Sequence, residues 1–433
     1  MPTLTSRRRV LQGLLASVPT TGLLGSGIGR SSPPAGPPRA ETVRILMPAP
    51  LADATAPAVQ QFNRRSGDVQ IAVSRGPLDT ETLSDLASSS LLLGDSPFDL
   101  LLMDVSWTPR YVAAGWLQPL ETLLGPGGLD GLVPAARLGN AFGGHLWRMP
   151  LSGDTALLYW RKDLLPHPPR DTLELEAMAR ELQKQGKVRW GYVWQGRQYE
   201  GLSCVLLEVL HAFGGRWWDG QAGRTDLSTP QALAAIRWLT NLVREGVSPP
   251  GVANFAENDA LDLFRAGEVA FLRNWPYAWQ LIAQENGPIT GKVGVAPLVG
   301  APGHPGGGTL GTWGLSLLAG CPRPMAAARV IRWLTGPEVQ RDLVRSQGYA
   351  PTWQSLYDDE DLQASHPLLQ VQAQALRHPL LRPLTPLYAQ ISDVLQRQGN
   401  ALFTSDLSPE VALARAQRQS DLLMRAAGAP TAP

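Results

Sequence analysis

Cysteine is scarce in this chain, which has only Cys204 and Cys321 among its 433 residues. So low a count excludes a disulfide-dense scaffold. Cys204 lies in an apolar stretch with helical character, and cysteine in such a setting is usually a buried free thiol. We therefore expect two free thiols, with a single disulfide in an oxidising compartment as the alternative.

An excess of either charge is also absent, because 38 basic and 37 acidic side chains leave a net charge of +1. A nucleic-acid-binding protein usually carries a basic surface, and an acidic tail forms a run of like charge. The sequence shows neither, so we expect no nucleic acid among its partners.

Signatures of common catalytic sites are missing as well. The six histidines have no paired metal-ligand spacing, and the chain has no nucleophile elbow and no phosphate-binding loop. We therefore expect no metal and no cofactor. The chain is instead rich in turn-forming glycine and proline, with 44 and 38 residues, and has 14 tryptophans. Tryptophan is enriched where proteins bind ligands, because it pairs a large apolar face with one N–H donor.

The N-terminal 40 residues have the layout of an export signal and linker. Residues 6–12 read SRRRVLQ and precede a weakly apolar segment, GLLASVPTTGLLGSGIG, and a proline-rich exit. This succession is typical of export signals, and the arginine pair resembles the twin-arginine signal. An ordinary secretory signal or a disordered tail is the alternative. We expect cleavage after Ala40 and a periplasmic location.

Beyond residue 40, strand-like and helix-like segments alternate, which is typical of an α/β fold with parallel-rich sheets flanked by helices. The run FDLLLMD is continuously apolar and ends in a carboxylate, as a strand buried on both faces does. Strands are predicted at 43–47, 69–73, 98–104, 157–160, 293–299 and 315–318. Helices are predicted at 54–66, 79–93, 173–186, 203–213, 230–245, 325–334, 383–398 and 409–427.

Aromatic residues gather in the stretch LRNWPYAWQ, residues 272–280, directly after the apolar run of a strand. Pro276 disfavours a helical conformation for Trp275 and suits the first position of the following helix. This order predicts Trp275 at the mouth of that helix, with Tyr277 close to it, and Trp279 in the core one turn on. Packing of both tryptophans in the core is the alternative.

Carboxylates and aromatic residues also occur at other strand ends, where open α/β sheets bind their ligands. Asp104 ends the buried strand, Asp154 precedes the strand at 157–160, Trp313 follows a glycine run, and Glu200 lies in WQGRQYEG. Three of them have a local alternative: Asp104 as a helix N-cap, Asp154 as a turn residue, and Trp313 as a side chain that fills a hole.

The combination of these residue types favours a sugar-like ligand. Carboxylates accept hydrogen bonds from hydroxyls, and aromatic faces cover the C–H faces of a sugar ring. A neutral polyol suits both, and it suits a chain without net charge. Two carboxylates are also the machinery of glycoside hydrolysis, so a secreted glycoside hydrolase is the enzymatic alternative to a binding protein.

Five segments in order resemble the extracellular solute-binding proteins of ABC sugar importers, family 1, in the maltose- and trehalose-binding branch. The segments are FDLLLMDVSWTPRYVAAGWLQPL, HLWRMPLSGDTALLYWRKDLL, FRAGEVAFLRNWPYAW, TLGTWGLSL with AAARVIRWLTGPEVQ, and RPLTPLYAQISDVLQRQGNALFTSDLSPEVALARA. Together the matching segments extend over nearly all of residues 41–425.

The resemblance implies a two-lobed periplasmic-binding-protein fold of type II with the ligand between the lobes. Lobe one would comprise 41–152 and 298–347, and lobe two 153–297 and 348–433. The family's ligand residues fall on Asp104, Asp154, Trp275, Gly311 and Trp313, with Tyr277, Glu200, Asp79 and Arg382 as weaker matches.

The resemblance also implies a function and partners. The chain would be a monomer without enzymatic activity that captures a disaccharide or a glucoside compatible solute. Trehalose, maltose, sucrose and glucosylglycerol are the types expected. The permease subunits of an ABC transporter in the membrane would then receive the solute.

Overall fold

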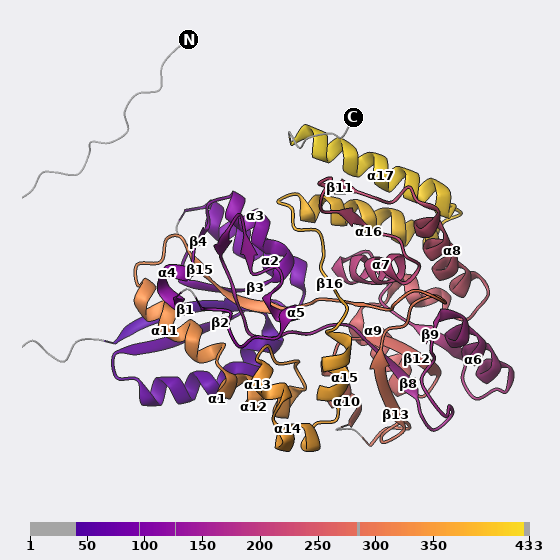
Figure 1. Cartoon of the computed structure of the whole chain (residues 1–433), viewed down its shortest axis with the longest axis horizontal. Coiled ribbons are helices and arrows are strands. Elements are labelled where there is room, and N and C mark those ends of the chain that lie inside the picture. Colours follow the sequence, from indigo (N-terminus) through magenta and orange to yellow (C-terminus); the bar gives the residue numbers. More distant parts are fainter. Residues whose placement is uncertain (1–39, 95, 126, 284–285, 428–433) are drawn as a thin grey trace, which may run out of the picture. The chain divides into compact units, whose positions relative to one another are not determined.

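The computed structural model describes residues 40–94, 96–125, 127–283 and 286–427. Apart from Ala40, the predicted export signal and linker lie outside these residues. The described chain contains two larger β-sheets with helices packed against them (Figure 1).

The first sheet has the strand order β2-β1-β3-β15-β4, and β7 also pairs with β15. Its strands are β1 (Glu41–Met47), β2 (Val69–Arg75), β3 (Leu100–Asp104), β4 (Leu117–Gln118), β7 (Met149–Pro150) and β15 (Trp313–Leu318). β1 is parallel to β2 and β3, whereas β15 is antiparallel to β3, β4 and β7. In Figure 1 the orange β15 accordingly lies beside strands from the first part of the chain.

Helices cover both faces of the first sheet, because successive side chains of a strand point to opposite faces. Leu100 and Leu102 pack in one core with helices α1 (Ala49–Arg65), α11 (Pro324–Leu334) and α12 (Pro337–Gln347). The alternate residues Leu101 and Met103 pack in a second core with α2 (Thr80–Leu92) and α3 (Thr108–Ala113). The prediction that FDLLLMD contains a strand buried on both faces is confirmed.

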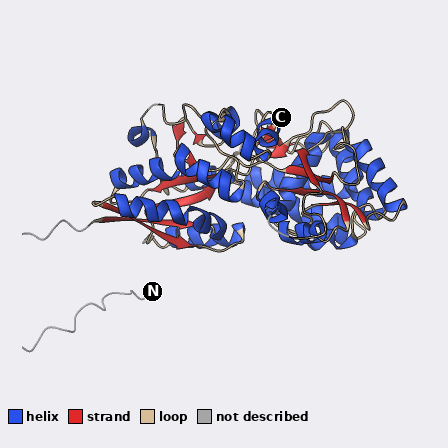
Figure 2. Ribbon diagram, turned by 90° about the horizontal axis from the view of Figure 1, so that it is seen from below, coloured by secondary structure: helices blue, strands red, loops and turns tan. Residues whose placement is uncertain are grey.

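The second sheet has the order β13-β8-β12-β9. Its strands are β8 (Leu157–Arg161), β9 (Trp190–Val193), β12 (Val269–Asn274) and β13 (Val293–Pro297). Alternation again separates two cores, since Leu158 and Trp160 pack in one and Leu157 and Tyr159 in the other. Figure 2 shows helices around the strands of both sheets.

Eight longer helices of the described chain contribute to these two cores. Some pack against the second sheet, and others pack against one another beside it. They are α6 (Thr172–Lys184), α7 (Glu200–Ala212), α8 (Pro230–Arg244), α9 (Glu257–Arg265), α10 (Tyr277–Ala283), α15 (Leu368–Ala375), α16 (Tyr388–Thr404) and α17 (Pro409–Ala426). Side-chain caps explain several of their starts: Asp171 accepts from the Glu174 N–H, and Thr229 caps α8 ahead of Pro230.

The remaining elements are short. They are η1 (Val105–Trp107), α4 (Glu121–Leu124), α5 (Pro134–Arg137), β5 (Ala141–Phe142), β6 (His145–Leu146), β10 (Trp218–Asp219), β11 (Arg224–Thr225), η2 (Pro250–Asn254), β14 (Gly308–Thr309), α13 (Gln354–Tyr357), α14 (Glu360–Ser365) and β16 (Pro379–Leu380).

The chain passes between the two sheets three times, through residues 151–156, 298–312 and 348–367. Backbone hydrogen bonds tie these crossings together: Gly153 N–H donates to the Ala350 carbonyl, and Gly311 N–H donates to the Asp154 carbonyl, each at 2.8 Å. The lobe boundaries expected from the sequence stay a prediction. Leu298, placed there at the start of the second part of lobe one, packs against the core of the second sheet.

The sheets are mixed: β1 is parallel to β2 and β3, and β12 to β9, whereas β15 and β8 run antiparallel to their neighbours. Two predicted helices need correction at their starts. The helix predicted at 54–66 begins earlier, at Ala49. The helix predicted at 383–398 begins only at Tyr388, since Pro383 and Pro386 disfavour helix in the residues before them.

Candidate ligand-binding site

Asp104 ends β3 and takes part in two interactions. Its carboxylate caps η1 by accepting from the Ser106 N–H at 2.8 Å and the Ser106 hydroxyl at 2.6 Å. The N-cap alternative from the sequence is therefore confirmed. The same carboxylate accepts from Nη2 of Arg382, which lies 2.8 Å from both of its oxygens.

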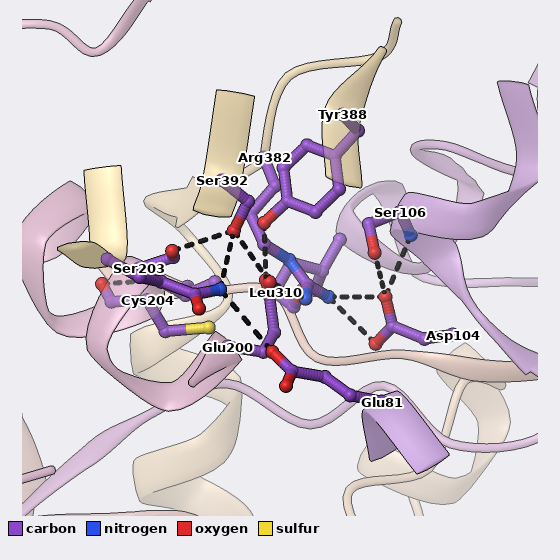
Figure 3. Close-up of polar contacts among 12 residues, drawn as sticks. Glu81, Asp104, Ser106, Glu200, Ser203, Cys204, Leu310, Arg382, Tyr388 and Ser392 are labelled. Atoms are coloured by element: carbon purple, nitrogen blue, oxygen red, sulfur yellow. Dashed lines mark hydrogen bonds and ion pairs between the residues drawn. The ribbon is translucent and has the colours of Figure 1, made fainter. Parts of the chain in front are cut away.

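Arg382 joins this carboxylate to Glu200, the first residue of α7. Its Nη1 donates to Glu200 at 2.8 Å, and only 3% of the arginine side chain is exposed. Glu200 also accepts from the hydroxyls of Tyr388 and Ser392 on α16. Figure 3 shows Asp104 and Glu200 at the Arg382 guanidinium, and the Tyr388 and Ser392 hydroxyls at Glu200. One cation thus links the end of a first-sheet strand to two helices beside the second sheet.

A third carboxylate, that of Glu81, lies at the edge of this network. Glu81 on α2 accepts from Gln396 of α16 at 3.4 Å (Glu81 is drawn in Figure 3). Burial, together with the negative charges of Glu200 and Asp79, raises the pKa of Glu81. Asp79 itself caps α2 by accepting from Thr82 and lies 3.9 Å from Arg197. These contacts bring α2 of the first sheet next to elements of the second.

Trp275 follows β12, and it is half-buried without belonging to any of the hydrophobic cores in the described chain. Its indole N–H donates to Glu257 at 3.2 Å, and the Arg273 guanidinium lies 4.4 Å from its ring centroid. Trp279, by contrast, packs against the core of the second sheet, as predicted, and so does Tyr277. The sequence-based division at Pro276 is confirmed for the two tryptophans, because α10 starts directly after that proline.

Gly311 lies against the Trp275 ring. A Cβ atom at Gly311 would stand 2.8 Å from Cζ3 of that ring, closer than van der Waals contact allows. Gly311 N–H also donates to the Asp154 carbonyl. The structure therefore brings Trp275, Gly311 and Asp154 into one neighbourhood.

Asp154 lies in the crossing between β7 and β8. Its carboxylate accepts from the Ala350 N–H at 2.8 Å, and no lysine or arginine pairs with it among the described residues. Burial raises the pKa of Asp154 to about 7, because a charged carboxylate loses its hydration there. A buried carboxylate without a cationic partner is unusual for a purely structural turn residue.

Trp313 begins β15 and is paired in register with Asp104. Its ring meets Trp107 edge to face at a centroid distance of 5.8 Å, and it packs against both cores of the first sheet. The packing alternative from the sequence is therefore observed, while the register keeps the half-buried ring next to the Asp104 carboxylate.

The predicted residues thus fall into two groups. Asp104, Glu200, Arg382 and Trp313 form one, and Asp154, Trp275 and Gly311 form the other. Asp79 and Tyr277 lie at the margin. Sequence reasoning missed Glu81, Arg273, Glu257, Tyr388 and Ser392. Arg273 carried a usable signal, because it is a charge at the end of an otherwise apolar strand, VAFLRN. Tyr388 and Ser392 carried none, since nothing local relates α16 to α7.

Other kinds of site find no support in the described residues. No cluster of three or more histidine, cysteine, aspartate or glutamate side chains there has the geometry to hold a metal ion. Both cysteines are free and buried, as expected. Among the described helices, none combines the length and the apolar character needed to cross a bilayer.

Solved structures with the same fold define the class of this protein. A maltose-bound MalE3 of T. maritima has a TM-score of 0.82 at 30% identity, covering 89% of this chain and 100% of that chain. A solute-binding protein from Thermotoga lettingae, bound to α-D-tagatose, has a TM-score of 0.79 at 23% identity, covers 89% and 100% of the two chains, and shares the fold. The chain is therefore a two-lobed α/β solute-binding protein, as the resemblance implied.

The chain belongs to the bacterial extracellular solute-binding protein family, whose sequence profile matches residues 48–341. A probable ABC transporter-binding protein of Deinococcus radiodurans is 32% identical over 349 residues, which cover 78% of this chain and 82% of that protein. A mannitol-binding protein of Pseudomonas aeruginosa is 26% identical over 388 residues, covering 83% and 88%. The predicted family is confirmed, and it is a family of binding proteins rather than of enzymes.

Proposed function

We propose that this protein captures a neutral disaccharide or a glucoside compatible solute and delivers it to the permease of an ABC importer. Trehalose, maltose, sucrose and glucosylglycerol are the types that the family resemblance implies. The observation that carries the proposal is the network in which Arg382 bridges Asp104 and Glu200. Arginine and carboxylate groups suit sugar hydroxyls, because charge-assisted hydrogen bonds are about twice as strong as neutral ones.

The remaining predicted residues have distinct roles in this proposal. Trp275 and Trp313 stack on the faces of the sugar, while Asp104 and Asp154 accept hydrogen bonds from its hydroxyls. Asp154 stands in a crossing between the sheets, so a hydroxyl bound there contacts the segment that connects the two lobes. A ligand that contacts both lobes only in the closed form shifts the protein toward closure.

The known relatives support a sugar or polyol rather than one particular compound. They include the maltose-bound MalE3, the mannitol-binding protein and a maltotriose-binding protein of Pyrococcus abyssi, which is 22% identical over 336 residues. Export by the twin-arginine-like signal to the periplasm and a monomeric state belong to the same proposal.

Calorimetry with trehalose, maltose, sucrose, glucosylglycerol and mannitol tests the proposal. One of them should bind with a dissociation constant near the micromolar range, equivalent to about −8 kcal/mol. Trp275→Ala should remove most of that binding, and Trp333→Phe, on the far first-sheet helix α11, serves as the control. Normal binding by Trp275→Ala would show that Trp275 does not stack on the sugar.

The hydrolase alternative makes an opposite prediction for the same carboxylates. Asp104 already accepts hydrogen bonds from Arg382 and Ser106, so its carboxylate oxygens are occupied by these donors rather than placed against a glycosidic bond. We expect no release of chromophore from aryl glycosides at any pH. Turnover that disappears in Asp104→Asn would establish the hydrolase instead.

A further inference from the structure

A buried ion pair lies directly behind the proposed stacking platform. Arg273 and Glu208 are 1% and 5% exposed, and the guanidinium donates from Nε at 2.9 Å and from Nη2 at 2.5 Å to the two carboxylate oxygens. Gln195 completes the shell by accepting from Nη1 at 3.0 Å. A buried ion pair contributes little net stability compared with apolar residues of the same volume, so its presence calls for another explanation.

Arg273 is placed to hold the ring of Trp275. Residues two apart on an extended chain project to the same face, and the guanidinium lies 4.4 Å from the ring centroid. Planar stacking on an indole is favourable for arginine in particular. The guanidinium cannot slide along the ring, because Glu208 and Gln195 fix its orientation.

Glu208 also fixes the chain segment on another side of the same ring. One of its carboxylate oxygens accepts from the Thr309 N–H at 3.0 Å, two residues before Gly311. Gly311 is the residue whose missing Cβ leaves room for Cζ3 of Trp275. A single carboxylate on α7 therefore orders both the cation over the ring and the backbone against the ring.

The polar contact of Trp275 completes this support. Its indole N–H donates to Glu257 at 3.2 Å, and Tyr159 donates to its backbone carbonyl at 2.8 Å. Because Arg273 covers one face of the ring, a ligand can stack at most on the opposite face.

We propose that Glu208 and Arg273 are positioning residues that fix the Trp275 ring before a ligand arrives. This inference rests on the proposed function of Trp275 as the stacking platform. A ring that is already immobile spares the ligand the entropy of ordering it, which amounts to roughly a three- to tenfold gain in affinity for one side chain. The pair also makes the platform one-sided.

The double variant Glu208→Gln/Arg273→Met tests the inference. Both new side chains are neutral and of similar length, so no unpaired buried charge remains, and the glutamine oxygen still accepts from Thr309. As a matched control, Arg161→Met/Asp163→Asn removes another ion pair next to β8 of the same sheet. Circular dichroism checks that each variant is folded.

The first measurement needs no sugar. In ligand-free protein labelled with 15N at its indoles, the signal of Trp275 is assigned from its loss in Trp275→Phe. In the double variant this signal should shift and broaden, while the signal of Trp333, on the first sheet, stays unchanged. In the control the Trp275 signal should stay as in wild type. An unaltered Trp275 signal would overturn the inference.

The second measurement is calorimetric titration with maltose. The double variant should bind roughly three- to tenfold more weakly than wild type, and the control should bind as wild type does. If Trp275→Ala loses binding while the double variant keeps it, the inference is wrong and the proposed function stands. If Trp275→Ala binds normally, the proposed function of the platform fails, whatever the indole signals show.

Arg273→Lys provides a second variant in case the double variant does not fold. It keeps the charge but loses the planar fork, so the same shift and broadening of the Trp275 signal are expected. A lysine variant with a wild-type Trp275 signal and wild-type affinity would count against the inference.

Discussion

One nitrogen of Arg382 lies 2.8 Å from each of the two carboxylate oxygens of Asp104, across a separation of 278 residues in the chain. The arginine comes from the segment before α16, and the aspartate from the end of a first-sheet strand. Their contact therefore depends on how the two lobes are held, and it is the basis for the first prediction.

Asp104→Asn should weaken sugar binding at least about tenfold and lower the free energy of unfolding by about 2–4 kcal/mol. Loss of one member of a buried ion pair costs about 3–5 kcal/mol, and here Arg382 retains Glu200. Calorimetry and urea denaturation measure the two effects. The control is Asp53→Asn, which breaks an exposed pair with Arg75 and should change neither. Equal behaviour of the two variants would contradict the role given to Arg382.

Asp154 should make the free energy of unfolding depend on pH. Its pKa is about 7 in the folded chain against an ordinary value of 3.8, so the folded state binds more protons than the unfolded state between these values. Wild-type stability contributed by this group is therefore present at low pH and is lost as the pH rises toward and through about 7.

Asp154→Asn removes that titration. The amide oxygen still accepts from the Ala350 N–H, and no charge has to be buried. Urea denaturation at about pH 5 and about pH 8 measures the free energy of unfolding of both proteins. Relative to wild type, the value for the variant should rise by on the order of 1–4 kcal/mol between the lower and the higher pH. A difference between the two proteins that is independent of pH would show that the Asp154 pKa is near its ordinary value.

Gly311→Ala should displace the Trp275 ring, because the added Cβ would lie 2.8 Å from Cζ3. We expect sugar affinity to fall roughly tenfold, since overpacking costs about 1–3 kcal/mol and the ring can relieve it only by moving. Gly67→Ala is the matched control, because a Cβ there meets no atom within 4 Å. Wild-type affinity of Gly311→Ala would place the sugar away from this ring.

The two tryptophans of the site should differ in what their loss does to stability. Trp313 packs against both cores of the first sheet and against Trp107, so Trp313→Ala should cost about 2–4 kcal/mol of unfolding free energy. Trp275 belongs to none of the cores in the described chain, and Trp275→Ala should cost under about 2 kcal/mol while removing more of the binding. Urea denaturation measures the loss of stability in each variant, and calorimetry measures the loss of binding. A larger loss of stability in Trp275→Ala than in Trp313→Ala would contradict the prediction.

Much of the secondary structure was predictable because its causes are local. A continuous apolar run marked β3, and Pro276 separated Trp275 from Trp279, since proline restricts its neighbours directly. The aspartate that ends β3 was recognisable as an N-cap for the same reason: the donor it binds, Ser106, is two residues away.

Only the tertiary structure decided what these residues contact. The pairing of Asp104 with Arg382, the hydrogen bond between Asp154 and Ala350, and the pairing of Arg273 with Glu208 behind Trp275 join positions far apart in the chain. Periodicity and capping act over a few residues, whereas an ion pair forms between whichever charges the crossings bring within reach. The sequence by itself therefore determined most of the longer strands, several helix starts and the residue types at the strand ends. The three passages of the chain between two sheets determined which of those residues meet.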